Sequence, residues 1–352
     1  MPELEQPTDV SPPAVGDSDE TSGGAPAKFL LLMVELLLIA GIVYVFEIEG
    51  RRLLFPVLCV MIGGFAVNTW LPTAFRMGFF ACLSVASVFI VLGLANGLYV
   101  LVAGGALIGI CFLPVGLWLR ISILVAAGIV LVVLRSQWPL PVWPVLGSMF
   151  MFRLMVYVYS TRKGGTNPPL TTTLSYFFMA PNVCFPLFPV VDFSTYRDSW
   201  YNGNPWEIYQ KGIVCIVRGL THLLLYRYIK FHLVPEPYEL YDVPHIALFM
   251  ATNYALYLHV SGQFHLIAGL LHLFGFDLPR THDRYFLASS FTDIWRRINI
   301  YWKDFMLKMF FFPTFYSLRG RGWKLGAATV AGVLVVFVST WLLHSWKIYW
   351  LL

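Results

Sequence analysis

Residues 77–119, MGFFACLSVASVFIVLGLANGLYVLVAGGALIGICFLPVGLWL, run from Arg76 to Arg120 without a single Asp, Glu, Lys or Arg between them. A helix needs about 20 consecutive apolar residues to cross the hydrocarbon core of a bilayer. This stretch is long enough for two such helices, which we predict at 77–95 and 98–119. It therefore predicts a membrane protein.

The composition of the whole chain supports the same conclusion. Of 352 residues, 58% are hydrophobic and only 12% are charged, whereas a soluble domain carries about 25% charged residues. The net charge of +5 is spread along the chain, which suits loops at lipid headgroups better than a nucleic-acid surface. The abundant Trp and Tyr suit the aromatic belts at membrane interfaces. We predict an all-α, polytopic integral membrane protein that binds membrane lipid and no nucleic acid.

Further apolar runs extend this pattern along the chain. They predict helices at 29–46, 53–70, 121–134, 141–159, 212–229, 244–260, 263–276 and 326–346. With the mixed stretch 285–312, the sequence gives about nine to eleven helical segments. Residues 1–27 are acidic and rich in Pro, Gly and Ser, which predicts a disordered tail. Residues 28–352 are expected to form a single membrane-embedded domain. The arginines between the runs set no orientation.

One apolar segment cannot form a regular helix. Residues 174–193, LSYFFMAPNVCFPLFPVVDF, contain three prolines. Proline lacks a backbone donor and breaks helices, so this segment predicts a broken or re-entrant helix. Irregular backbone at membrane depth has to be covered by protein or line a cavity, and such segments often border binding sites.

The stretch 285–312, YFLASSFTDIWRRINIYWKDFMLKMFFF, mixes apolar and charged residues. Ser290 and Asp293 are suited to cap a helix start. The run is interrupted too often for a lipid-facing span, by Arg296, Arg297, Lys303, Asp304 and Lys308. We therefore expect an amphipathic helix in the membrane interface, a position from which it can cover the mouth of a cavity.

Two polar side chains in apolar surroundings are candidate functional groups. A buried amide such as that of Asn299 needs hydrogen-bond partners, and taken alone it is more often structural than catalytic. His344 lies near the end of the last apolar run. An ionisable residue in a membrane segment suggests function, whereas a position near the helix end also allows the side chain to reach the interface.

The remaining histidines and the cysteines do not form a recognisable metal motif. His259, His265 and His272 are too widely spaced for a zinc motif of the HExxH type, and a polar stripe between helices is the favoured interpretation. The five cysteines show no paired spacing, so we expect neither a disulfide framework nor a metal site. The sequence also contains no nucleophile elbow, P-loop or dinucleotide-binding fingerprint.

Five blocks in a fixed order resemble one known family. They are VWPVLGSMFMFRLMVYVYSTRKG (142–164), LSYFFMAPNVCFPLFPVVDFSTYRDS (174–199), YALYLHVSGQFHLIAGLLHLFGFDLP (254–279), FLASSFTDIWRRINIYWKDF (286–305) and VSTWLLHSW (338–346). Together they resemble the membrane-bound O-acyltransferases, particularly the branch that acylates bacterial polysaccharides. The block with the WRR sequence is the most specific of the five.

The resemblance implies roles for individual residues. His344 stands at the place of the family's invariant histidine and would act as general base. Asn299 would donate its amide hydrogens to a thioester carbonyl or orient the acceptor; the bacterial branch usually has His there. Substrate-binding residues are implied at Asp293, Trp295, Arg296, Arg297 and His265. His265 replaces the family's usual Asp, and the glycines that normally flank the invariant histidine are also replaced.

The resemblance also implies the substrates and the setting. No bound cofactor is expected, and an acyl thioester, carried by coenzyme A or an acyl carrier protein, would be the co-substrate. An acyl group, with acetyl favoured, would pass to a hydroxyl of a polysaccharide, lipid or other exported acceptor. The expected location is the bacterial inner membrane, with partner proteins of an envelope-modification system. Because family members often continue beyond this point, the chain is expected to be a C-terminally shortened or naturally short member.

Two other classes of function remain open from the sequence. A catalytically inactive relative could assemble acylation machinery at the membrane, and the replaced glycines favour it slightly. A transporter could use the broken segment and the intramembrane histidines to bind a substrate.

Overall fold

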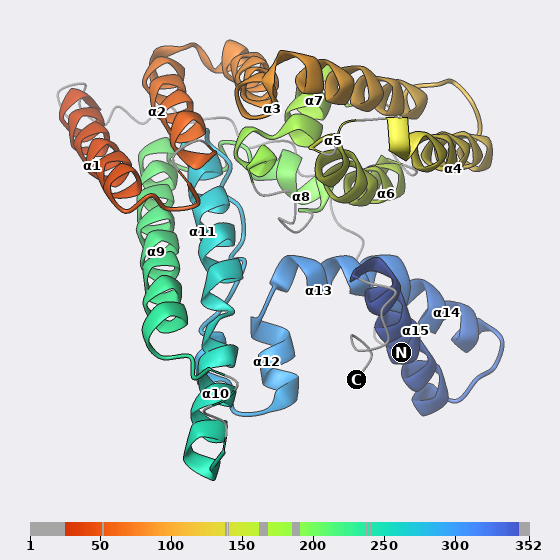
Figure 1. Ribbon diagram of the computed structural model, residues 1–352. Helices are drawn as coiled ribbons and strands as arrows, with labels where there is room; N and C mark the ends of the chain where they lie inside the picture. The colour runs from red at the N-terminus through yellow and green to blue at the C-terminus, as the bar shows by residue number, and fades with distance from the viewer. Residues whose placement is uncertain are drawn as a thin grey trace.

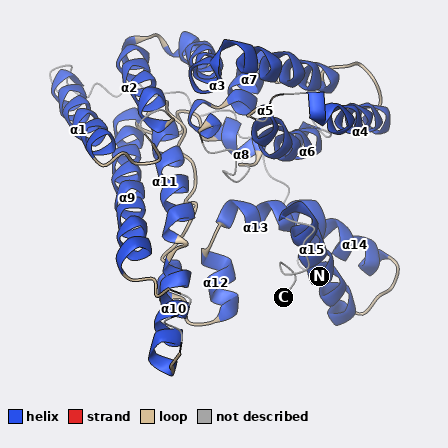
Figure 2. Cartoon of the chain, viewed as in Figure 1, coloured by secondary structure: helices blue, strands red, loops and turns tan. Residues whose placement is uncertain are grey.

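The computed structural model describes residues 25–50, 53–137, 139, 141–161, 168–184, 191–236, 238 and 241–344, and the fold of these residues is all-helical (Figures 1 and 2). Most of the predicted tail lies outside these residues. The elements are α1 (Ala25–Val45), α2 (Leu54–Trp70), α3 (Thr73–Cys111), α4 (Leu117–Val133), η1 (Leu134–Gln137), α5 (Val142–Pro144), η2 (Val145–Phe150), α6 (Met151–Thr161), α7 (Leu170–Phe178), η3 (Ala180–Val183), α8 (Phe193–Asp198), α9 (Pro205–His232), α10 (Val243–Ala255), α11 (Leu258–His272), η5 (Tyr285–Leu287), α12 (Phe291–Arg297), α13 (Ile300–Met306), η6 (Leu307–Phe311), α14 (Phe312–Gly320) and α15 (Leu325–His344).

Several of these helices have the length and composition of membrane spans. Five are long and apolar enough to cross a bilayer: Ala25–Val45, Thr73–Cys111, Val142–Thr161, Pro205–His232 and Leu325–Leu343. The shorter helices α2 and α4 are apolar as well. Many of their large apolar side chains are exposed, which is stable only where lipid replaces water. The chain is therefore an all-helical, polytopic integral membrane protein, as the composition predicts.

Helices α9 and α11 lie side by side, as Figure 1 shows on the left of the molecule. Glycines bring their backbones together. A Cβ atom on Gly219 would lie 2.8 Å from the carbonyl oxygen of Gly262, and one on Gly269 would lie 2.7 Å from that of Gly212. Small residues at such contacts let membrane helices approach closely. Residues 279–285 run next to this helix pair, with His282 against Phe264 and the Tyr285 hydroxyl donating to Ser261.

The predicted spans at 77–95 and 98–119 differ from the structure at their ends. They form one long element, α3, which is kinked at Gly93 (φ 76°, ψ 170°), a backbone conformation that glycine adopts without steric cost. The helix ends at Cys111, because Pro114 disfavours a helical conformation in the residue before it. The predicted span at 98–119 was therefore too long, and its last residues belong to α4.

The proline-rich segment 174–193 is broken after Phe178, as predicted, and this break is buried; residues 185–190 lie outside the described residues. Helix α7 ends at Phe178, and the short turn η3 follows. Arg153 on α6 is 2% exposed, and its Nη1 atom donates to the carbonyl oxygens of Tyr176 and Phe177, each at 2.7 Å. Its Nη2 atom donates to Oδ1 of Asn182. The buried guanidinium thereby satisfies carbonyl groups that the end of α7 leaves without helical partners.

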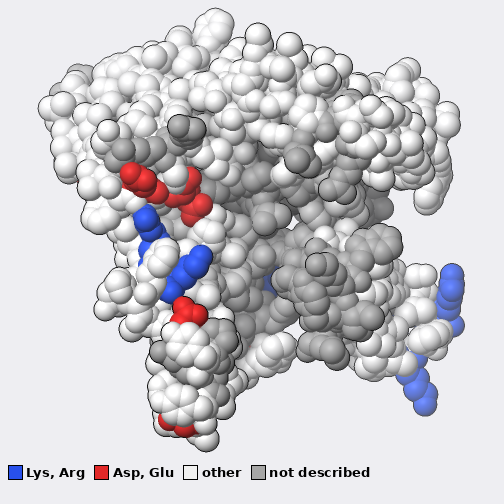
Figure 3. Space-filling model, in the orientation of Figure 1, with Lys and Arg blue, Asp and Glu red and all other residues white. Residues whose placement is uncertain are grey.

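Charged side chains are unevenly distributed over the described surface. On the face shown in Figure 3 they gather beside the loop after α1, over the lower parts of α9 and α10, and at the lower right. The broad upper part over α1–α4 shows none among the described residues of that face. An uncharged surface of this extent suits contact with lipid tails.

Candidate active site

The block with the WRR sequence is divided into two helices by Asn299. Ser290 caps α12 by accepting a hydrogen bond from the backbone N–H of Asp293 at 3.2 Å. Asn299 adopts the left-handed conformation (φ 42°, ψ 58°) and caps α13, its Oδ1 atom accepting from Trp302 N at 3.3 Å. Asparagine is one of the few residues that enter this conformation readily. The sequence did not predict that the mixed stretch would turn at this residue.

The joint between α12 and α13, which we call the Asn299 joint (Arg297–Ile300), is fixed by residues 279–283. The backbone N–H of Ile300 donates to Thr281 O, and that of Asp283 donates to Arg297 O, both at 2.9 Å. The hydroxyl of Tyr301 donates to Pro279 O at 2.6 Å. Hydrogen bonds thus hold the backbone on both sides of Asn299, and this fixes the direction of its side chain.

The two arginines of the WRR sequence have different surroundings. The Nε atom of Arg297 lies 2.9 Å from Oδ1 of Asp293, so the two charges largely compensate each other. Arg296 is exposed, and no partner for its guanidinium occurs among the described residues. Trp295 is 39% exposed. Arg296 is therefore the cation of this pair that is available to an anionic ligand.

The end of α15 lies near the end of α13 and the turn η6 that follows it. The side chain of His344 falls outside the described residues. The residue before it, Leu343, packs in one apolar cluster with Trp302, Phe305 and Val156. Figure 1 shows α15 beside the end of α13. The structure thus places the last turn of α15 at the apolar cluster beside α13, while the Asn299 joint lies at the start of that helix.

His265 lies in a different place from the other predicted site residues. It is buried on α11, with its ring centroid 5.4 Å from that of His222 and 5.8 Å from that of His282. We call these three the histidine cluster. The hydroxyl of Tyr257 lies 3.1 Å from Nε2 of His282. Sequence reasoning missed this cluster because no local pattern shows that the segment with His282 turns back and packs against α11.

The histidine cluster connects to the Asn299 joint through the chain itself. Thr281 and His282 are both buried. The carbonyl oxygen of Thr281 and the backbone N–H of Asp283 bond to the joint. Among the described residues, no group of three or more His, Cys, Asp or Glu side chains is placed to hold a metal ion. Hydrogen bonds to Ser261 and to Tyr257 hold His222 and His282 in place.

An ion pair that the sequence did not predict joins η6 to the residue that precedes α8. The Nζ atom of Lys308 is 2.6 Å from Oδ1 of Asp192, and the pair borders a cavity of about 90 Å³ that Tyr301 and Asp304 also line. Burial alone would raise the pKa of Asp192, but hydrogen bonds from Lys308, Ser194 and Ser160 outweigh it and hold that pKa below its ordinary value. Asp192 is therefore a carboxylate at neutral pH.

This ion pair gives the first testable prediction. Because the pKa of Asp192 is depressed by folding, its contribution to stability is present above the unfolded pKa of about 3.9 and is lost as the pH falls through the folded value. Asp192→Asn is expected to lower the free energy of unfolding by about 1–3 kcal/mol at pH 7. Urea unfolding of the detergent-solubilised protein measures the difference, which should shrink at acidic pH. If the difference in unfolding free energy between the two proteins stays constant down to acidic pH, the Asp192 carboxylate does not stabilise the fold.

Comparison with known protein families and with curated proteins finds no match for this chain. The assignment of a function therefore depends on the residues and their arrangement.

Proposed function

We propose that the chain is a membrane-bound O-acyltransferase that moves an acyl group from a thioester to the hydroxyl of an exported acceptor. The observation that supports it most is that α13, which belongs to the WRR block, and the turn η6 after it contact all four of the other blocks that resemble this family. Phe152 on α6 packs edge-on against Trp302, with ring centroids 5.5 Å apart. Lys308 pairs with Asp192, Tyr301 bonds to Pro279, and Leu343 of α15 joins the cluster of Trp302.

The proposed reaction is a direct transfer. His344 takes the proton from the acceptor hydroxyl while the oxygen of that hydroxyl attacks the carbonyl carbon of the thioester. A C–O bond forms, the C–S bond breaks, and the proton passes from the imidazole to the leaving sulfur, giving a free thiol. Since Oδ1 of Asn299 caps α13, its Nδ2 hydrogens are the part of the amide that can stabilise the developing oxyanion.

The same proposal assigns the binding groups and the setting. Exposed Arg296 would contact the phosphates of a coenzyme A or acyl-carrier donor, with Trp295 beside it. Arg297 and Asp293, paired with each other, would stabilise α12. The proposed location is the bacterial inner membrane, with envelope-modifying proteins as partners, since a hydroxyl acceptor bound for export would meet the enzyme there.

Replacing Asn299 by glycine tests this assignment. Glycine accepts the left-handed conformation and costs only a few tenths of a kcal/mol as a helix cap, so the fold should remain. Loss of one oxyanion donor is expected to lower the transfer rate by about 10²–10³-fold. The measurement is the initial rate of transfer of radiolabelled acetyl from acetyl-CoA to a membrane extract. An unchanged rate in a folded Asn299→Gly protein would show that Asn299 is structural only.

A transporter is the second candidate, and the histidine cluster favours it. Buried ionisable residues in a membrane protein often mark the path of an ion or substrate, and His222, His265 and His282 lie close together. A transporter would act without any acyl donor and would tolerate His344→Ala. Substrate uptake into vesicles that contain no thioester would distinguish the two functions.

A further inference from the structure

The segment 279–285 connects the histidine cluster to the Asn299 joint. On one side, backbone groups of Thr281 and Asp283 bond to the joint, each at 2.9 Å. On the other side, His282 is buried against α11, with its ring centroid 5.8 Å from that of His265. Any movement of His282 away from α11 therefore moves the backbone groups that hold the joint.

The histidine cluster differs from other described histidines in its partners. Three other rings lie near a carboxylate oxygen: His245 near Asp242 at 2.5 Å, His259 near Glu49 at 2.8 Å and His272 near Asp277 at 3.7 Å. Among the described residues, the ring nitrogens of the cluster have only neutral partners, namely Ser261, Cys215, Tyr257 and Thr281. A proton taken up by the cluster would thus be a buried charge without a counter-charge, which is costly.

The described side chains around the cluster offer it no free negative charge. The titratable and charged groups that face or adjoin it are Cys215 and Arg218 of α9, Tyr254 of α10, Tyr257 before α11, Arg280, Asp283, Arg284 and Tyr285 of the segment, and Tyr301 of α13. Arg218 repels a positive charge on the cluster, and Asp283 pairs with Arg280 at 3.6 Å. Burial, together with repulsion from His222, lowers the pKa of His282 to about 3.

This low pKa links proton uptake by His282 to movement of the segment. When the segment separates from α11, the pKa of His282 returns to about 6.5, the ordinary value for histidine. Because the pKa of the held state is lower, the held state has its full stability above about pH 6.5 and loses it relative to the released state as the pH falls. The ratio of released to held protein rises about tenfold per pH unit for each proton taken up.

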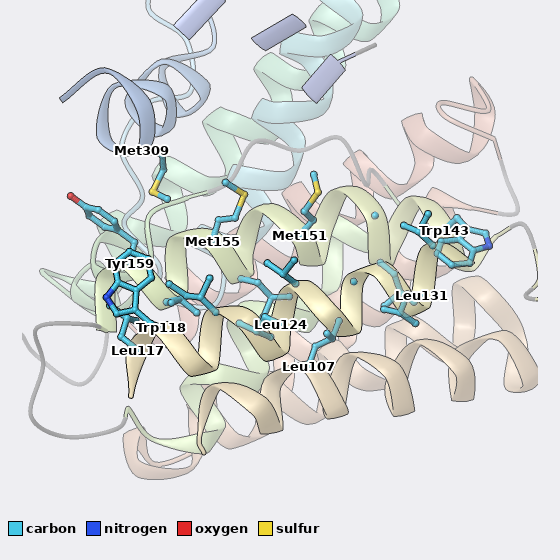
Figure 4. Close-up of a pocket in the computed structure, with 18 residues that line it drawn as sticks. Leu107, Leu117, Trp118, Leu124, Leu131, Trp143, Met151, Met155, Tyr159 and Met309 are labelled. Carbon is cyan, nitrogen blue, oxygen red and sulfur yellow. The ribbon is translucent and has the colours of Figure 1, made fainter. Parts of the chain in front are cut away.

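The apolar groove between α4 and α6, with a volume of about 640 Å³, takes no part in this response. Its lining side chains include no histidine and no charged residue (Figure 4). Tyrosine, with an ordinary pKa of about 10, does not titrate in the range of histidine. The backbone of α4 is therefore an internal reference, whose protection should stay the same while the joint opens.

We propose that the histidine cluster is a pH-sensitive latch on the Asn299 joint. With neutral rings, the latch holds residues 281–283 against α11 and keeps the joint formed, and proton uptake by the cluster releases them. Histidine suits this role because its charge changes close to physiological pH once it is released. The inference goes beyond the proposed acyl transfer and does not depend on it, because the hydrogen bonds of the joint are present whatever the chain catalyses.

Two histidine variants allow a matched test. Glutamine in place of His282 keeps a polar group that can bond to the Tyr257 hydroxyl but takes up no proton. His245 provides the control, because it lies in the first turn of α10, pairs with Asp242 and is not part of the cluster. His282→Gln therefore removes one titrating ring from the latch, and His245→Gln removes one elsewhere.

The experiment measures hydrogen–deuterium exchange of the full chain in lipid nanodiscs from about pH 7.5 to about pH 5, corrected for the intrinsic effect of pH. The amide hydrogens of Asp283 and Ile300, which form bonds of the joint, report its opening. In wild type, corrected exchange should rise about tenfold or more per pH unit below about pH 6.5, while α4 stays constant. His282→Gln should lower this rise by about tenfold per pH unit, and His245→Gln should behave as wild type.

Three results would overturn the latch. The first is exchange at the joint that stays constant over this range in wild type. The second is an equal rise in α4, which would indicate general acid unfolding. The third is a rise that is unchanged in folded His282→Gln protein. If that variant does not fold, His222→Gln removes another ring of the cluster and should also lower the rise.

The measurement also separates this inference from the proposed function, since it contains neither an acyl donor nor an acceptor. A joint whose exchange does not respond to pH leaves the acyltransferase standing. A chain that transfers no acyl group can still show the latch.

Discussion

His344→Ala is expected to lower the rate of acyl transfer by about 10²–10⁴-fold, the usual contribution of a general base. Without the imidazole, the acceptor hydroxyl has to attack with its proton still in place. The residue ends α15, whose last turn packs through Leu343 into the apolar cluster beside α13. Substrate binding should change little, so the loss should appear in kcat. Initial rates with saturating acyl donor measure it.

A second histidine variant provides the control. His232 is exposed at the end of α9, and Figure 1 shows α9 on the opposite side of the molecule from α15. His232→Ala should transfer at the wild-type rate, and both variants should unfold at the wild-type temperature. Equal rates for His344→Ala and wild type would assign the base to another residue. Equal losses in both variants would indicate that alanine substitutions disturb the protein generally.

Arg153→Met is expected to destabilise the protein by about 2–6 kcal/mol, the summed cost of leaving two buried carbonyl oxygens without a donor. Methionine fills the space but cannot donate to the carbonyl oxygens of Tyr176 and Phe177, which remain buried. Each unsatisfied buried acceptor costs about 1–3 kcal/mol. The midpoint of urea unfolding in detergent, together with its slope, measures the loss.

The matched control for Arg153→Met is Arg321→Met, because Arg321 is exposed after α14. An exposed substitution of this kind usually changes stability by less than about 0.5 kcal/mol. Equal midpoints for Arg153→Met and Arg321→Met would mean that other groups or water satisfy the end of α7. In that case Arg153 would have to be assigned a role in binding.

Much of the fold could be predicted because lipid-facing helices depend on local composition. The apolar runs at 53–70 and 326–346 match α2 and α15 closely, since a helix in lipid satisfies its backbone internally. The predicted end of 98–119 is wrong because the apolar run continues past Pro114, whereas the helix ends before it. A helix end depends on single residues such as proline, whereas the average composition of a stretch does not show where those residues lie.

The site could be predicted only where its signal is local. Asn299 and the WRR sequence stand out within one short stretch, and the structure gives them a fixed position. The pair Asp192–Lys308 joins residues 116 apart in the sequence. The histidine cluster forms only because the segment with His282 turns back and packs against α11. Neither contact can be predicted from the spacing of residues in the sequence, because contacts between distant segments depend on how the helices pack together.

The most direct test of the central claim is the stoichiometry of the reaction. Purified full-length chain in nanodiscs is given a radiolabelled acyl-CoA, acetyl or palmitoyl, and a membrane extract. The proposed function predicts one equivalent of free thiol for each labelled ester formed on the acceptor. The product should be an oxygen ester, which resists neutral hydroxylamine and is cleaved by alkaline hydroxylamine. Folded protein that yields neither thiol nor labelled ester with either donor would contradict the claim.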